Sequence, residues 1–290
     1  MKKKKNKGQI VLHMVFLVLM AVYILPILVL IASSFTDETA LIQNGYSLIP
    51  SVFSMEAYET AFRNPMKMIL AYGVNIFYTI AATALSTLVI ALLAYPLSRD
   101  TFIWRKQLNF FVYFTMLFSG GLVPSYLLIR NILHMDDTIW VYIVPCLVSA
   151  YNVLIVRTSY RAIPNELVEA AKIDGARELY ICFRIIIPLS KASIASVSFL
   201  YMVDRWNDWM TSMLYIRNPD LYSLQYLLQK LLREAEALKN YAAAGDASAV
   251  MPAETLRFAM ALVAAGPVLM VFPFFQKYFT KGMTLGGVKG

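Results

Sequence analysis

Residues 68–98 read MILAYGVNIFYTIAATALSTLVIALLAYPLS and contain no Asp, Glu, Lys or Arg. An α-helix rises about 1.5 Å per residue, so about 20 residues cross the roughly 30 Å hydrocarbon core of a lipid bilayer. A helix also satisfies its own backbone hydrogen bonds where water is absent. This stretch therefore predicts a transmembrane helix.

Four further stretches lack these charged residues and are each at least 19 residues long, namely 10–36, 107–129, 138–156 and 258–276. A sixth stretch, 185–203, is interrupted only by Lys191, which lies near its start. A lysine at that place can extend its ammonium group to the membrane surface. The chain is therefore predicted to be an all-α membrane protein with six transmembrane helices.

The overall composition agrees with lipid as the solvent. Hydrophobic residues make up 59% of the 290 residues and charged residues 15%, whereas soluble domains have about 45–50% and about 25%. Cys146 and Cys182 are the only cysteines, and the chain has two histidines. We therefore expect neither a disulfide framework nor a metal site.

The formal net charge of +8 is unevenly distributed between the two sides of the membrane. The segments on one side are 1–9, 98–107, 157–191 and 277–290, and those on the other are 33–69, 130–137 and 204–257. The first set carries 17 Lys and Arg residues and the second 9. The positive-inside rule places the first set, with both termini, in the cytoplasm. Charge spread over four segments does not form one basic face, which argues against nucleic acid as a partner.

The first apolar stretch follows a lysine-rich start, as a secretory signal would. It is far longer than the apolar part of a signal peptide, and no small-x-small cleavage site follows it. We expect it to remain as an anchored helix. The predicted division is a basic cytoplasmic N-terminus (1–9), a six-helix transmembrane domain (10–276) and a cytoplasmic C-terminal tail (277–290).

The cytoplasmic loop at about 157–188 predicts a short helix, a turn and a second helix. Pro164 suits the first turn of a helix, and Asp174-Gly175 suits a turn that needs a positive φ. Apolar residues at spacings of three and four are expected to share one face; they are Ile163, Leu167, Ala170 and Ala171. An amphipathic helix that lies on the lipid surface fits this composition equally well.

The loop contains Glu169-Ala170-Ala171, three residues, Gly175, nine residues, and Ile185-Ile186-Ile187-Pro188. This string resembles the EAA motif of importer-type ABC permeases, with Ile187 where Leu is usual. The resemblance implies a coupling helix that docks into a cleft on a cytoplasmic ATPase subunit. The implied coupling residues are Glu169, Ala170, Ala171, Asp174, Gly175 and Pro188.

The chemistry of the motif suits docking. Alanines permit close backbone approach, the Glu169 carboxylate can meet a basic residue, and Gly175 can turn the chain sharply. Glu166 and Glu178 flank the motif, and we expect them to be less sensitive to substitution than Glu169.

Two further segments are similar to the carbohydrate-uptake branch of these permeases, and to its MalG-like members in particular. They are Val203-Asp204-Arg205-Trp206-Asn207-Asp208-Trp209 and the tail QKYFTKGMTLGGVKG at 276–290. The resemblance implies that the tail inserts between two ATPase subunits and that Gly286, Gly287 and Lys289 contact them. A frayed basic terminus is the alternative.

Several polar residues near the outer side or inside the predicted helices suit a substrate pathway. Two tryptophans beside Asn and Asp form the mixture that sugars favour, although an aromatic belt at headgroup depth explains them too. Gly120-Gly121 before Pro124 predicts a break in the third helix. The predicted pathway residues are Asn75, Gly120, Asn152, Trp206, Asn207 and Asp208.

Leucines at helical spacing within 221–239 predict an amphipathic helix outside the membrane. We expect it to pack on the protein or on lipid; contact with an external binding protein is the alternative. Residues 242–248 predict a flexible link to the last helix.

These features predict a multi-pass permease subunit of an ATP-driven importer of sugars, expected to be oligosaccharides, in a prokaryotic plasma (inner) membrane. The sequence has no GxxxxGK[ST] phosphate loop, so ATP and Mg²⁺ belong to a separate subunit. We expect no catalytic site and no bound cofactor in this chain. The resemblance implies a second permease in a heterodimer, an ATPase dimer and an extracytoplasmic solute-binding protein.

Three alternatives remain at this point. An ABC permease for peptides or polyamines would share the EAA motif. An ion-coupled carrier that works alone would need an ionisable residue deep in a helix, and five of the six stretches contain no Asp, Glu, Lys or Arg. A membrane-embedded enzyme would need an intramembrane cluster of His or carboxylate residues, which the sequence does not offer.

Overall fold

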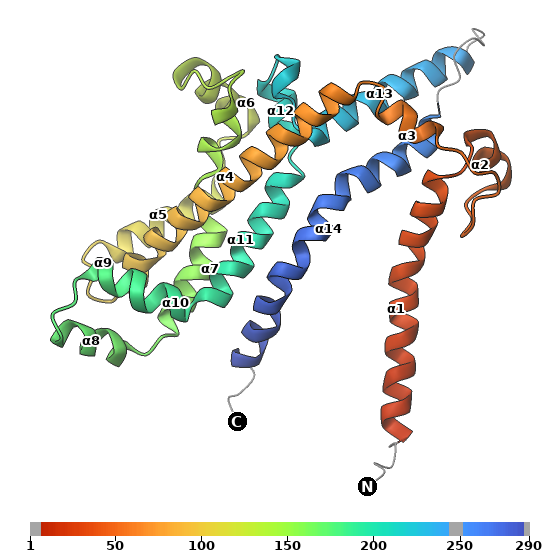
Figure 1. Cartoon of the computed structure of the whole chain (residues 1–290). Helices are drawn as coiled ribbons and strands as arrows, with labels where there is room; N and C mark the ends of the chain where they lie inside the picture. The colour runs from red at the N-terminus through yellow and green to blue at the C-terminus, as the bar shows by residue number, and fades with distance from the viewer. Residues whose placement is uncertain (1–6, 244–251, 287–290) are drawn as a thin grey trace. The chain divides into compact units, whose positions relative to one another are not determined.

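The computed structural model describes residues 7–243 and 252–286 (Figure 1). Within these ranges the chain is helical, and its one β feature is an isolated antiparallel bridge between Thr36 and Phe53. The chain divides into two compact units. The first comprises Met1–Pro65 and Leu228–Gly266, and the second comprises Met66–Leu227 and Pro267–Gly290.

The first unit contains three helices, α1 (Lys7–Ser34), α2 (Glu38–Asn44) and α3 (Glu56–Ala61), together with most of α13 (Leu224–Ala243) and the first part of α14 (Ala253–Gly286). The second unit contains the start of α13 and the rest of α14. Its other elements are α4 (Pro65–Ser98), α5 (Arg105–Leu117), α6 (Leu122–Leu127), η1 (Leu128–Ile132), η2 (Ile139–Tyr142), η3 (Val144–Cys146), α7 (Ala150–Arg161), α8 (Asn165–Ile173), α9 (Glu178–Ile181), η4 (Cys182–Ile186), α10 (Ile187–Leu189), α11 (Lys191–Trp206), α12 (Met210–Tyr215) and η5 (Pro219–Leu221).

Three helices are long and apolar enough to cross a membrane unbroken, over Val11–Ser34, Pro65–Ser98 and Ala253–Tyr278. Three bent pairs of helices pass the same test, with bends of 111°, 47° and 80°. The predicted all-α membrane protein is confirmed, and the predicted six spans are reached when each bent pair counts as one span.

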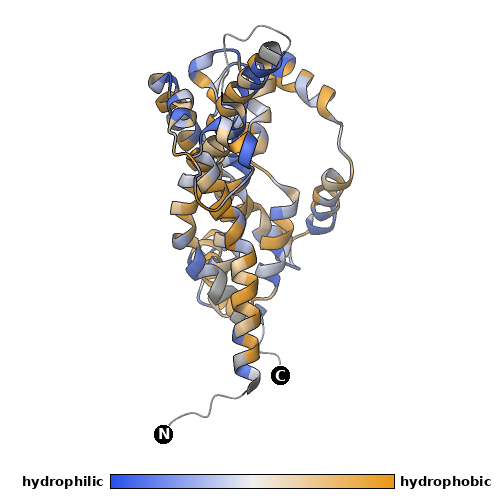
Figure 2. Cartoon of the chain, turned by 90° about the vertical axis from the view of Figure 1, so that its right-hand side faces the viewer, coloured by the Kyte–Doolittle hydropathy of each residue, from blue (hydrophilic) through white to orange (hydrophobic). Residues whose placement is uncertain are grey.

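Helix α1 consists of hydrophobic residues along most of its length (Figure 2). Its large apolar side chains are exposed; Leu17 is 62% exposed and Tyr23 is 74% exposed. A soluble monomer rarely exposes an apolar surface that extends so far. Such a helix is stable in lipid, because its backbone polar groups are bonded within the helix.

The bend of 111° lies where the glycine pair predicts a break. Helix α5 ends at Leu117 and α6 begins at Leu122, and Gly121 between them has a φ of +89°. An L-residue with a side chain rarely adopts this backbone conformation, which explains the glycine.

The other two bends lie within the predicted spans 138–156 and 185–203, and the apolar stretches alone do not indicate them. The first stretch contains two 3-10 turns before α7, with Pro145 in the second of them. In the second stretch, a π-helical turn and α10, which contains Pro188, precede the bend into α11. Proline has no N–H for the ordinary helical hydrogen bond, and π-turns accommodate such irregular places.

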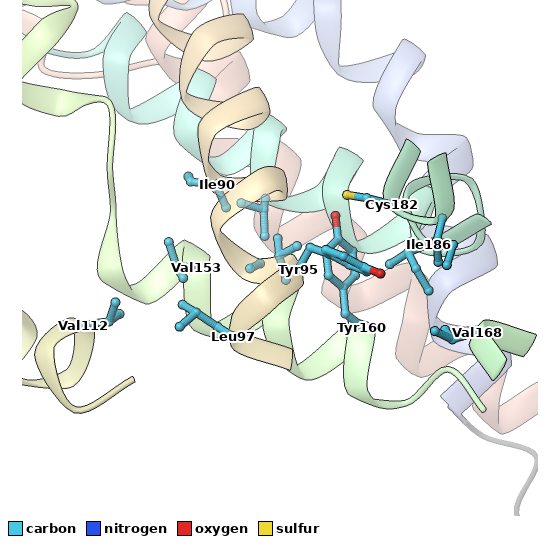
Figure 3. Close-up of a cluster of buried hydrophobic side chains, with 13 residues drawn as sticks. Ile90, Tyr95, Leu97, Val112, Val153, Tyr160, Val168, Cys182 and Ile186 are labelled. Carbon is cyan, nitrogen blue, oxygen red and sulfur yellow. The ribbon is translucent and has the colours of Figure 1, made fainter. Parts of the chain in front are cut away.

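One hydrophobic cluster holds the second unit together at the end of α4 (Figure 3). It joins Tyr95 of α4, Tyr160 of α7, Val168 of α8 and Ile186 of η4, and the last three are at most 6% exposed. The short helix α8 is thereby attached to three other elements. In Figure 1, α8 and α9 lie at the opposite end of α4 from α6 and α12.

The end of α4 is capped by side chains from other helices. The Leu97 carbonyl accepts hydrogen bonds from Arg157 Nε at 3.1 Å and from Asn109 Nδ2 at 3.3 Å. Arg99 is 8% exposed and donates from Nη2 to the Tyr160 carbonyl at 3.2 Å. Cations are favourable near a helix C-terminus because its carbonyl groups are unpaired there.

In the first unit, a buried carboxylate caps the start of α14. Glu38 is 6% exposed, and its two oxygens accept hydrogen bonds from the backbone N–H groups of Glu254 (3.0 Å) and Thr255 (2.8 Å). The Thr255 hydroxyl lies 2.9 Å from the same carboxylate. The negative charge also suits the positive end of the helix dipole.

We expect Glu38→Ala to lower the free energy of unfolding by about 1–3 kcal/mol, because it leaves buried N–H groups unpaired at the start of α14. The measurement is denaturant unfolding of the purified subunit in detergent. The matched control is Glu59→Ala, since Glu59 is exposed on α3. Equal changes in the two variants would contradict the capping role.

Candidate coupling site

Helix α8 ends in a backbone motif that requires glycine. The N–H of Ala176 donates to the Ala171 carbonyl at 2.9 Å, and the N–H of Gly175 donates to the Lys172 carbonyl at 3.0 Å. This pair of bonds is the Schellman motif, in which the residue after the C-cap is left-handed. Gly175 has a φ of +80°. The predicted positive-φ turn is therefore confirmed.

The face of α8 that packs on the core differs from the predicted one. Val168 is buried and Ala171 is partly buried against the cluster of Figure 3, whereas Leu167 and Ala170 are exposed. Ile163 also packs on the cluster, but it precedes the helix, which begins at Asn165. The prediction that Ile163, Leu167, Ala170 and Ala171 share one face is wrong, because the first of them is not helical and Val168 takes the inner position.

The outer surface of α8 combines apolar side chains with an unpaired carboxylate. Leu167 is 46% exposed and Ile173 is 86% exposed. Glu169 lies among them, is exposed, and has no hydrogen-bond or ion-pair partner among the described residues. Glu166 is exposed on the same helix and equally without a partner within that part of the chain. This outer surface of Leu167, Glu169, Ala170 and Ile173 is available for a partner.

Glu178 connects the loop to the transmembrane helix α4. One oxygen of its carboxylate lies 2.6 Å from Lys172 Nζ, and the other accepts a hydrogen bond of 2.5 Å from the Tyr95 hydroxyl. The Arg99 guanidinium lies 5.4 Å from the centre of the Tyr95 ring. Side chains from α8, α9 and α4 thus meet at one carboxylate.

The sequence pattern does not indicate this link, and the expectation that Glu178 is less sensitive to substitution than Glu169 does not take it into account. Tyr95 is 83 residues away from Glu178 in the chain, so no local pattern indicates their contact. The six-residue spacing of Lys172 and Glu178 across a predicted turn is the only sequence signal that favours their pairing.

The hydrogen bonds from Lys172 and from Tyr95 lower the pKa of the Glu178 carboxyl from its ordinary value of 4.5. A carboxyl whose pKa is lower in the folded chain stabilises the fold at pH values above its unfolded pKa, and this contribution is lost as the pH falls through the folded value. The link between the loop and α4 should therefore weaken in acid below about pH 4.5.

We expect backbone amides of residues 165–181 to exchange with deuterium faster at pH 3.5 than at pH 6, after correction for the intrinsic exchange rates. Glu178→Gln should exchange faster than the wild type already at pH 6 and should show a smaller change with pH. The same pH effect in both proteins would show that another group is responsible.

A hollow of about 580 Å³ lies beside the turn that follows α8. Its polar lining comes from Asp174, Arg177, Tyr180 and Arg184, and Gly175 forms part of its wall. The added Cβ atom of a residue at position 175 would meet no other atom within 4 Å. The space beside Gly175 is therefore open in the isolated chain.

The remaining residues of the predicted coupling set lie elsewhere. Pro188 is exposed on α10, on the bent segment that leads into α11. Gly286 is the last residue of α14, while Gly287 and Lys289 lie outside the described residues. The contacts of the tail with an ATPase stay a prediction.

At the other end of the second unit, Asn75 binds three segments together. Its amide donates to the Trp206 carbonyl at 3.3 Å and accepts hydrogen bonds from the Tyr78 hydroxyl at 2.8 Å and from the Leu224 N–H at 3.2 Å. Asn75 has no exposed surface, and Trp206 is 5% exposed. The structure therefore gives both residues a role in holding the end of α11 and the start of α13 to α4.

Asp208 and Asn207 have different environments. The Asp208 carboxylate accepts hydrogen bonds from the Thr211 N–H at 3.0 Å and hydroxyl at 2.6 Å, and it lies 3.0 Å from Arg205 Nη1. Asn207 is exposed and donates to the Val203 carbonyl at 2.8 Å. Their contact with a substrate stays a prediction, as it does for Asn75 and Trp206.

The other predicted pathway residues are separated from this group. Gly120 is exposed at the break between α5 and α6. Asn152 is 7% exposed in the first turn of α7, where its N–H donates to Ser149 Oγ. Asn152 lines a cleft together with Arg205. The structure thus brings Asn75, Trp206 and Asp208 together and places Asn152 on a separate cleft.

Comparison with known proteins shows the family of the chain. The profile of the family described as "Binding-protein-dependent transport system inner membrane component" matches residues 3–285. The chain belongs to this family.

Individual members of the family are similar over nearly the whole chain. The polygalacturonan/rhamnogalacturonan transport system permease protein YtcP of Bacillus subtilis is 38% identical over 278 residues, which cover 95% of this chain and 96% of YtcP. The arabinooligosaccharides transport system permease protein AraQ of Halalkalibacterium halodurans is 29% identical over 282 residues, covering 95% and 94%.

A solved structure shows the same fold. It is described as the crystal structure of a bacterial ABC transporter involved in the import of the acidic polysaccharide alginate. One of its chains is 26% identical to this chain with a TM-score of 0.76, and the match covers 96% of this chain and all of the other. The predicted resemblance to importer-type ABC permeases is confirmed.

Family membership makes this binding-protein-dependent permease a transport subunit of the inner membrane, and not an enzyme. It also sets aside the carrier that works alone, because the family depends on further components. A partner permease, an ATPase and a binding protein are implied in general terms by the family.

Proposed function

We propose that the chain is one of two membrane subunits of an ABC importer that moves oligosaccharides into the cytoplasm. The observation that carries the proposal is the 38% identity, over 95% of the chain, to a permease named for polygalacturonan and rhamnogalacturonan transport. Relatives named for arabinooligosaccharides and galactooligosaccharides support the same class of substrate. Their names favour sugars over peptides or polyamines.

The proposed role of α8 is to receive the movement of the ATPase. Its outer surface supports this role, because it combines exposed Leu167 and Ile173 with the Glu169 carboxylate, which has no partner among the residues that the structure describes. Apolar side chains around a charge that becomes desolvated are typical of the centre of a protein interface.

The proposed route of transmission continues from α8 into the membrane. Val168 packs into the cluster that contains Tyr95, and Glu178 bonds Lys172 to Tyr95. A packed cluster and charge-assisted hydrogen bonds move together as a body, so a shift of α8 would displace the end of α4.

The proposed partners are a second permease in a heterodimer, an ATPase dimer that binds ATP and Mg²⁺, and an extracytoplasmic solute-binding protein. The tail with Gly286, Gly287 and Lys289 is proposed to reach between the ATPase subunits. This chain contains no phosphate loop in its sequence, which is consistent with ATP binding on a separate subunit.

Uptake by cells that lack the gene tests the proposed substrate class. Deletion should abolish ATP-dependent uptake of at least one radiolabelled oligosaccharide from a panel of arabino-, galacto- and galacturono-oligosaccharides, and a plasmid copy should restore it. Peptide and polyamine uptake should remain unchanged. Loss of peptide or polyamine uptake, with normal uptake of every sugar, would contradict the proposal.

A further inference from the structure

A cleft of about 420 Å³ lies between α7 and α11 in the second unit. Ligand pockets commonly enclose roughly 300–1,000 Å³ and combine apolar walls with a few polar groups. Here the polar lining comes from Ser149, Asn152, Asp204 and Arg205 with the thiol-bearing Cys146, and the other lining residues are Val148, Tyr151, Leu200 and Tyr201.

The side-chain amide of Asn152 has no hydrogen-bond partner among the described residues, although the residue is only 7% exposed. The hydrogen bond of Asn152 to Ser149 Oγ uses the backbone N–H. The amide atoms of Asn152 are not sealed from solvent, and they face the open space of the cleft, which Asn152 lines. The Asn152 amide is therefore free to donate to and accept from the hydroxyl groups of a ligand.

The other walls are fixed in position. Arg205 lies 2.7 Å from Asp204, 3.0 Å from Asp208 and 2.8 Å from the Cys146 sulfur. The Tyr201 hydroxyl donates to the Cys146 carbonyl at 2.6 Å. These bonds join the end of α11 to the segment before α7, so the polar groups of the cleft are held in place before any ligand arrives.

The charges of the cleft favour an uncharged ligand. Arg205 is the one cation among the described lining residues, and two carboxylates already neutralise it. The Asp204 side chain is 67% exposed, so it would repel a carboxylate. Asn and Asp groups bond readily to hydroxyls, and the exposed ring of Tyr151 can cover the apolar face of a sugar.

We infer that this cleft contacts an uncharged, hydroxyl-bearing unit of the transported oligosaccharide, with Asn152 and Asp204 bonded to its hydroxyls and Tyr151 against its ring. The inference rests on the proposed function and deepens it, because it makes this subunit a direct participant in the sugar pathway.

A native cysteine makes the occupancy of this cleft measurable by alkylation. Cys146 lines it, and Cys182, the only other cysteine of the sequence, is buried. The experiment uses the complete transporter in nanodiscs with its binding protein. N-ethylmaleimide is added with and without arabinotetraose, galactotetraose or tetragalacturonate, and alkylation of the Cys146 peptide is followed by mass spectrometry. Uptake of the same three sugars is measured in proteoliposomes.

The expected result is that an imported neutral sugar slows alkylation of Cys146 at least about threefold. Import of a neutral sugar without protection would overturn the cleft assignment and leave the proposed function intact. Protection by tetragalacturonate alone would also overturn the cleft assignment. So would a Cys146 thiol that is alkylated neither with nor without sugar, because Cys146 must be accessible when the cleft holds no sugar. Import of none of the sugars would overturn the proposed function as well.

Substitution provides a second measurement. Asn152→Ala should raise the neutral-sugar concentration needed for half protection by about three- to tenfold, which corresponds to one hydrogen bond. Thr158→Ala is the matched control on α7, because this exposed hydroxyl bonds only to the Leu154 carbonyl of its own helix. If the Asn152 variant does not assemble, Asp204→Ala replaces it, because the Asp204 side chain is 67% exposed and alanine cannot bond a hydroxyl. Equal half-protection concentrations in variant and control would overturn the inference.

Discussion

Gly175→Leu should reduce ATP-driven uptake by about tenfold or more while the chain remains inserted in the membrane. Gly175 has a φ of +80° and completes the Schellman motif of α8. Left-handed backbone costs an L-residue about 1–2 kcal/mol, so the turn should relax and tilt α8. No atom lies within 4 Å of an added Cβ, and the isolated subunit should therefore tolerate the side chain. Uptake by proteoliposomes that contain the complete transporter gives the measurement.

Gly175→Asn is the matched control for this prediction. Asparagine tolerates left-handed backbone better than other residues with a side chain, so its uptake should stay within about threefold of the wild type if the backbone conformation is what matters. Normal uptake and normal substrate-stimulated ATP hydrolysis in Gly175→Leu would remove the basis for calling α8 a coupling helix.

Glu169→Ala should weaken binding of the ATPase without affecting the fold. Glu169 is exposed and has no partner within the described part of the chain, and such substitutions usually change stability by less than about 0.5 kcal/mol. Removal of one member of an interfacial charge pair costs about 2–5 kcal/mol, much of it from the charge left unpaired on the partner. We therefore expect at least a tenfold loss of affinity in pull-down titrations of the ATPase subunit.

Glu166→Ala is the control for Glu169→Ala, because both carboxylates are exposed on α8 and unpaired among the described residues. Glu178→Ala is unsuitable, since Glu178 bonds Lys172 and Tyr95. Small and equal effects at positions 166 and 169 would indicate a helix that lies on the lipid surface.

Much of the fold is predictable because lipid imposes a simple rule on sequence. The stretches that become α1, α4 and most of α14 are long and free of charges, and a single helix is the structure that satisfies their backbone in lipid. The break at Gly121 was also predictable from its glycine pair. The bends near Pro145 and Pro188 were not, because an apolar stretch has the same hydropathy whether its helix is straight or bent.

The candidate site was predictable only where its geometry is local. The turn at Gly175 depends on bonds between residues three and five positions apart, and its sequence signal is correspondingly clear. The inner face of α8 depends on the cluster formed with α4 and α7, so Val168 was overlooked. Likewise, the contact of Tyr95 with Glu178 exists only after the helices pack.

Photocrosslinking from position 170 examines the proposed coupling surface directly. Ala170 is exposed on the outer surface of α8, and p-benzoylphenylalanine replaces it in the complete transporter. Asn207, which is exposed between α11 and α12, provides the control position. We expect a crosslink from position 170 to the ATPase subunit and none from position 207. Crosslinks from position 170 to lipid alone, in a transporter that still imports sugar, would contradict the assignment of α8 as the ATPase contact.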